Sequence, residues 1–107
     1  MLAERFAAHM AAYGVPSGPP DAQIGSTDMG NVSHVCPTIH PSLAICEPGV
    51  PKHSLAFRER ARTARADEVT LLAATLVAQV AYELLADPAR VEAAWQAFRA
   101  SGAGTTT

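Results

Sequence analysis

Residues 69–86 read VTLLAATLVAQVAYELLA, an apolar stretch within a chain of 107 residues. Most of its large apolar residues recur at the spacing of one helical face, but Leu71, Val77 and Leu85 fall outside that face. A helix that is apolar over most of its circumference packs on more than one side. We therefore predict a long buried helix that takes Asp67 as its N-cap and reaches Ala86.

The same stretch approaches the length of a membrane span. Four polar residues interrupt it, and no cluster of Lys or Arg flanks either end; the interrupting residues are Thr70, Thr75, Gln79 and Glu83. These features favour the helix of a soluble protein. No membrane partner is expected.

The composition is typical of a small domain that contacts a partner. Residues of the AVILMFWYC set reach 49%, and charged residues make up 17%, against about 25% in an average domain. Some apolar surface is therefore expected to be covered by another molecule. The net charge of −2 is spread along the chain without a basic stripe, so no nucleic-acid partner is expected.

The cysteines and the first residues bear on the cellular compartment. Cys36 and Cys46 are too few for a disulfide framework and do not form a CxxC pair, so two reduced, buried thiols are expected. Glu4 and Arg5 come where a signal peptide would have its apolar run, so export is not expected. Both features predict a cytoplasmic protein.

Helices are also predicted on either side of the long one. Residues 1–14 carry an apolar helical stripe that Gly14 ends, and 15–28 form a loop rich in Ser, Gly and Pro. Residues 55–101 are helical throughout apart from short breaks, and 102–107 form a frayed tail. Asp87 followed by Pro88 predicts the start of the last helix, with Val91, Trp95 and Phe98 facing inward.

Residues 29–53 are predicted to hold a short helix, a strand and a ligand loop. The helix begins near Met29 and cannot continue past Pro37. The run SLAIC at 42–46 is apolar and bounded by turn residues, which is typical of a short strand buried on both faces. One strand makes no sheet, so the chain is predicted to be a single partial domain of α/β class. The alternative is a helical domain with one odd apolar segment.

Two segments carry residues suited to chemistry. Asp28 follows Gly25, Ser26 and Thr27, where it either caps a helix or lies beside free N–H groups that could receive a carboxylate. His53 ends a loop that follows the predicted strand, a common place for functional groups, although a lone histidine is weak evidence for a metal. Among the other histidines, His34 is expected to be partly buried and bonded to main chain. His9 is read as a helix-flank residue without a special role.

Three motifs in fixed order are GSTDMGNVS at 25–33, PTIHP at 37–41 and PGVPKHSLAF at 48–57. Together they resemble the C-terminal segment of the catalytic domain in the zinc-dependent peptidase/amidohydrolase family. That family includes aminoacylases, carboxypeptidase-type exopeptidases and the aminobenzoyl-glutamate utilisation protein B-like amidohydrolases, to which the motifs are most similar. The resemblance implies the C-terminal part of a zinc-exopeptidase-like α/β domain, mostly helical in this chain with one or two short strands.

The resemblance also implies site residues and a cofactor. His53 matches the late histidine that completes the family's metal site. The residues implied to line the cleft are Gly25, Ser26, Thr27, Asp28, Asn31 and His40. One or two zinc ions would polarise the substrate carbonyl and activate a water molecule, with a glutamate as general base.

The remaining parts of such a site are expected outside this chain. They are an early histidine, a bridging aspartate, the general-base glutamate with its neighbouring glutamate ligand, and a lid domain that forms a homodimer. The chain alone is therefore expected to be incomplete and inactive. The implied reaction is hydrolysis of an amide bond next to a free carboxylate, in an N-acyl amino acid, a dipeptide or an aminobenzoyl-glutamate.

A second hypothesis is a non-catalytic helical module for interaction or oligomerisation. It would use the apolar long helix and the face that carries Trp95 and Phe98. This hypothesis explains the helices, but it leaves GSTDMGNVS without a role.

Overall fold

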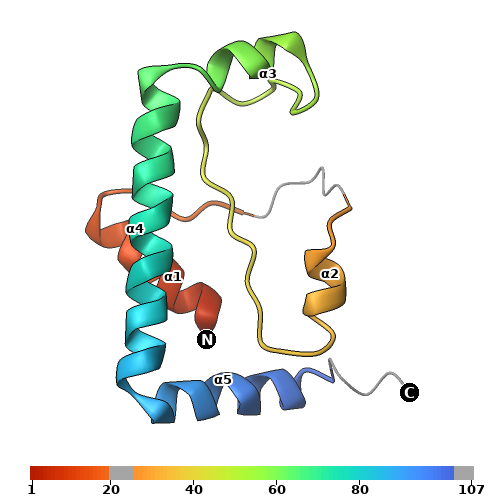
Figure 1. Ribbon diagram of the computed structural model, residues 1–107, viewed down its shortest axis with the longest axis vertical. Helices are drawn as coiled ribbons and strands as arrows, with labels where there is room; N and C mark the ends of the chain where they lie inside the picture. The colour runs from red at the N-terminus through yellow and green to blue at the C-terminus, as the bar shows by residue number, and fades with distance from the viewer. Residues whose placement is uncertain (20–25, 103–107) are drawn as a thin grey trace.

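The long apolar stretch forms the central helix of the molecule. The computed structural model describes residues 1–19 and 26–102, and within them α4 (Ala64–Ala86) runs along the longest axis (Figure 1). The helix begins earlier than Asp67, because the Thr63 side chain accepts a hydrogen bond from the backbone N–H of Ala66 at 3.2 Å. Asp67 instead lies in the first turn, where its charge suits the helix dipole.

Two further helices contact α4. Helix α1 (Leu2–Ala12) crosses one face of it, and α5 (Pro88–Ala100) turns away from its C-terminal end (Figure 1). The predicted cap at Asp87 is confirmed, because its side chain accepts a hydrogen bond from the Ala89 N–H at 3.0 Å and Pro88 opens the helix. Gly14, with φ of 74°, follows α1 as predicted.

Two short helices lie in the middle of the chain. Helix α2 (Met29–Val32) is a single turn, and α3 (Leu55–Arg60) is capped by Ser54, whose side chain accepts a hydrogen bond from the Phe57 N–H at 3.1 Å. Helix α3 lies near the N-terminal end of α4, and α2 lies in the half of the molecule that contains α5 (Figure 1).

The core is small and lies where α1 crosses α4. Its buried centre consists of Phe6, Leu76 and Val80, of which Leu76 is fully buried. Partly buried apolar side chains surround that centre: Leu2, Met10, Ile39, Leu43, Leu72 and Leu84. The core therefore draws on α1, α4 and the segment that connects α2 to α3.

The predicted strand at 42–46 is wrong. Among the described residues there is no strand, and 37–47 run beside α4 as an extended segment without backbone–backbone hydrogen bonds between described residues (Figure 1). Ile39 and Leu43 pack against the core cluster, so the apolar residues are covered by helix side chains instead of by neighbouring strands. A strand needs a ladder partner for its N–H and C=O groups. The α/β fold class is therefore corrected to a helical one.

The expectation that α4 packs on more than one side is also wrong. Its outer side carries Leu71 and Leu85, which are 71% and 86% exposed. The chain as a whole exposes 7927 Å², whereas a compact protein of this mass exposes about 5,700 Å². By length and composition α4 could also cross a membrane, with 17% of its apolar window buried. Much of the apolar surface thus remains uncovered by the chain itself.

Candidate functional site

A charge cluster centred on Glu83 joins α1 to α4. The Arg5 guanidinium donates to both carboxylate oxygens, with the Nε to Oε2 distance at 2.9 Å. The His9 Nε2 lies 3.0 Å from Oε1, and Arg90 at the start of α5 lies 3.9 Å from Oε2. The Glu83 side chain is 19% exposed. Three elements therefore meet at one carboxylate.

This cluster keeps Glu83 ionised. The hydrogen bonds from Arg5 lower the pKa of Glu83 to about 2, against the opposing effect of partial burial, and the charges of Arg5, His9 and Arg90 act in the same direction as those bonds. The carboxylate raises the pKa of Arg5 in return. A group with so low a pKa is poorly suited to proton transfer near neutral pH. The cluster is therefore a structural clamp between helices, not an acid–base pair.

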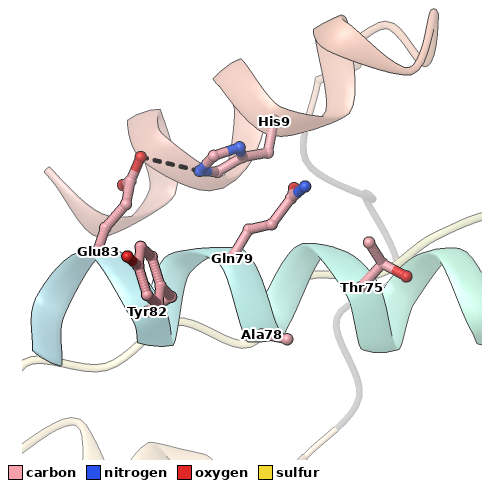
Figure 2. A pocket seen from close by; sticks show the side chains of 6 residues that line it. All are labelled: His9, Thr75, Ala78, Gln79, Tyr82 and Glu83. Carbon is pink, nitrogen blue, oxygen red and sulfur yellow. Dashed lines mark hydrogen bonds and ion pairs between the residues drawn. The ribbon is translucent and has the colours of Figure 1, made fainter. Parts of the chain in front are cut away.

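Beside the clamp lies an open groove of about 540 Å³ between α1 and α4. Figure 2 shows His9 reaching from α1 toward Glu83, with Gln79 and Tyr82 on the α4 side. The groove is lined by His9, Thr75, Ala78, Gln79, Tyr82 and Glu83. The Gln79 Nε2 donates to the Tyr13 hydroxyl at 3.1 Å, and the Thr75 hydroxyl donates to the Leu71 carbonyl at 2.9 Å. Among the described residues no side-chain base is hydrogen-bonded to the Thr75 hydroxyl, so Thr75 is not an activated nucleophile.

The first predicted segment lies at the start of α2. Ser26, Thr27 and Asp28 are exposed, and the Thr27 hydroxyl accepts a hydrogen bond from the Met29 N–H at 3.3 Å. Asp28 makes no side-chain cap bond, although it occupies the N-cap position, so capping does not explain its presence. Asn31 is also exposed. Gly25, the remaining member of this segment, lies outside the described residues.

The two predicted histidines occupy exposed positions on other parts of the chain. His40 lies on the extended segment, between Ile39 in the core and the exposed Pro41, and His53 immediately precedes the Ser54 cap of α3. In Figure 1 the residues before α3 lie near the N-terminal end of α4, whereas α2 lies in the half of the molecule that contains α5. Among the described residues, no metal-binding group contains both His53 and Asp28.

A complete zinc site is not present in the described part of the chain. Catalytic zinc needs three protein ligands and an open position. Among residues 1–19 and 26–102, no three His, Cys, Asp or Glu side chains are grouped so that they could hold a metal ion. Cys36 and Cys46 are free thiols and are only partly buried, so the expectation of buried thiols is not met. His53 could supply one ligand at most.

Sequence reasoning missed the clamp, and it assigned His9 no special role. A signal was available, because Glu83 is the one charged residue within 69–86. A carboxylate on an otherwise apolar helix needs a charged partner if it is shielded from water. Arg5 and His9, spaced four apart on one face of α1, offer that partnership.

An exposed surface of α4 is its outer face, which we define by seven exposed residues: Leu71, Ala74, Thr75, Ala78, Ala81, Tyr82 and Leu85. Tyr82 is 72% exposed, and Leu71 and Leu85 are the most exposed leucines of this helix. No charged residue belongs to this face. Contiguous exposed apolar surface of this kind marks an interaction site.

No family model, curated protein or solved structure matches the chain. The resemblance of the three motifs to the zinc-dependent peptidase/amidohydrolase family therefore stays a prediction from the residues quoted.

Proposed function

We propose that this chain is the C-terminal portion of a metal-dependent amidohydrolase or peptidase that hydrolyses an amide bond next to a free carboxylate. The three motifs in fixed order are the basis of this proposal. One structural observation supports it: four polar side chains of the motifs are not used by the fold. Asp28, Asn31, His40 and His53 are exposed and form no side-chain hydrogen bond or ion pair among the described residues.

Packing and capping account for most polar residues of a small domain, and here they do not account for these four. In the proposed role His53 serves as one metal ligand, while Asp28, Asn31 and His40 line the substrate cleft. The other ligands and the general base come from polypeptide outside this chain. The chain alone, with no ligand set in its described part, is inactive.

The test is made on the protein extended to include the upstream catalytic half. We expect it to bind one or two zinc ions per subunit and to hydrolyse N-acyl amino acids, dipeptides or aminobenzoyl-glutamate. His53→Ala should lower kcat/KM by orders of magnitude, because the loss of one of three metal ligands weakens metal binding. His34→Ala is the matched control, since His34 is also exposed but lies outside the proposed site. Full activity of His53→Ala would contradict the proposal.

A second candidate function is that of a non-catalytic helical interaction module. The observation that favours it is the exposed, uncharged outer face of α4. Such a module should form a stable, metal-free oligomer with one sharp melting transition. Sedimentation of the purified chain measures its mass, and a chain that is unfolded alone would contradict this candidate.

A further inference from the structure

We propose that the outer face of α4 binds the same face of a second copy, with the two α4 helices antiparallel and the contact centred on Ala78. This inference rests on the second candidate function and names its partner. It does not depend on the amidohydrolase proposal.

The spacing of the face suits helix pairing. Leu71, Ala74, Ala78, Ala81 and Leu85 follow one another at intervals of three and four residues, the repeat of a coiled-coil seam. All five are exposed in the single chain. The three central positions are alanines, and small side chains allow two helix backbones to approach closely. The seam therefore has the shape of a short, tight helix–helix contact.

The face is complementary to itself when one copy is turned around. Leu71 and Leu85 lie seven residues on either side of Ala78, so an antiparallel arrangement sets each leucine against the other leucine of the second copy. In the same arrangement Ala74 of one copy lies opposite Tyr82 of the other, which places a small side chain against a large one. Ala78 meets itself at the two-fold axis. A two-fold interface requires this kind of match.

Charge favours the antiparallel direction over the parallel one. Asp67 and Glu68 lie together near the N-terminus of α4, just before the face begins. A parallel pair would place these two acidic residues beside their copies, and like charges repel. An antiparallel pair separates them to opposite ends and also opposes the two helix dipoles.

The length of the face favours a second copy over a lipid bilayer. From residue 71 to residue 85 the helix rises about 21 Å, less than the hydrocarbon core of about 30 Å. Glu83 lies between residues 71 and 85 and is paired with Arg5 and His9 on α1. Insertion of α4 into a bilayer would therefore bring these charged groups into the hydrocarbon core. The apolar seam is instead the size of a helix–helix contact.

The dimer should be weak. A helix face about 21 Å long and about 10 Å wide is smaller than a standard interface of about 800 Å² per partner. We expect dissociation in the micromolar range, where the average mass rises with concentration. Sedimentation equilibrium of the full chain should show masses between one and two copies over a roughly hundredfold range of concentration.

Leu71→Arg tests the face, and Leu55→Arg is its control. Both leucines are 71% exposed, but Leu55 lies on α3, away from the outer face of α4. We expect Leu71→Arg to lower the association constant by about 100-fold, because each copy loses a buried leucine and places a charge in the seam. Leu55→Arg should leave the association constant unchanged. Circular dichroism checks that both variants keep their helices.

Cysteine cross-linking tests the direction. In a background with Cys36→Ser and Cys46→Ser, Ala78→Cys should form a disulfide with its own copy under mild oxidation. Leu71→Cys should cross-link to Leu85→Cys in a mixture but not to itself. Self-linking of Leu71→Cys would overturn the antiparallel arrangement.

The failures of this inference and of the module can be told apart. If the wild type and Leu71→Arg form oligomers of equal mass, the module function is supported, but the outer face of α4 is not its interface. A monomer at every concentration overturns both. A third outcome is a wild-type chain that stays monomeric and binds phosphatidylcholine–phosphatidylglycerol vesicles, while Leu71→Arg does not bind them. That outcome would overturn the proposed dimer and identify lipid as the partner of this face.

Discussion

The two sides of α4 are nearly equal in apolar character and opposite in environment. On the inner side Val69, Leu76 and Val80 are 6%, 0% and 8% exposed, whereas Leu71 and Leu85 on the outer side are 71% and 86% exposed. The inner side is covered by α1 and by the extended segment 37–47. Apolar periodicity therefore marks surfaces suited to burial, but the described part of the chain supplies a partner for only one side.

The largest loss of unfolding free energy is expected from a substitution on the inner side of α4. Leu76→Ala removes the only large side chain that is fully buried among residues 1–19 and 26–102, and it leaves a cavity between α1 and α4. Such a change costs about 2 to 5 kcal/mol of unfolding free energy, a large share of the stability of a small domain. Thermal unfolding followed by circular dichroism measures the loss. A change below about 1 kcal/mol would mean that the core does not hold the fold together.

A smaller loss of stability is expected from Glu83→Gln, and the size of this loss should depend on pH. The native pKa of Glu83 is about 2, below its ordinary value of 4.5, so the unfolded chain binds a proton first as pH falls. The carboxylate stabilises the fold fully above pH 4.5, and this contribution is lost between pH 4.5 and pH 2. The melting temperature of the wild type should exceed that of Glu83→Gln above this window, and the difference should shrink within it.

Glu92→Gln is the control for that comparison. Glu92 is paired with Arg99 at 2.9 Å, but both side chains are 60% exposed, and exposed pairs contribute little. Its melting temperature should follow the wild type over the same pH range. A Glu83→Gln difference that is independent of pH would contradict the clamp.

The smallest effect on unfolding is expected from the outer side. Leu71→Ala leaves no cavity in the single chain, so its unfolding free energy at low concentration should change by less than about 0.5 kcal/mol. The measurement is denaturant unfolding of dilute protein beside Leu76→Ala. Equal losses in the two variants would show that the outer side is also packed, and would remove the difference between the two sides.

The candidate site could be predicted only in part. The motifs can be read directly from the sequence. The side chains of Asp28 and His53 are exposed and form no hydrogen bond among the described residues, as a role in ligand binding requires. Their positions relative to each other could not be read from the motifs, because these positions depend on the path of residues 37–47. The strand at 42–46 failed for a related reason: an extended apolar run has the same pattern whether strands or helix side chains cover it.

The sequence by itself determined the helices. The cap at Asp87, the stop at Gly14 and the apolar periodicity of 69–86 act over a few residues, and each corresponds to a helix or a helix end in the structure. Tertiary structure alone decided which side of α4 is covered, where the extended segment lies and that Glu83 pairs with Arg5, 78 residues away. Burial and ion pairing depend on neighbours that are distant in the chain, and those neighbours exist only once the helices have packed.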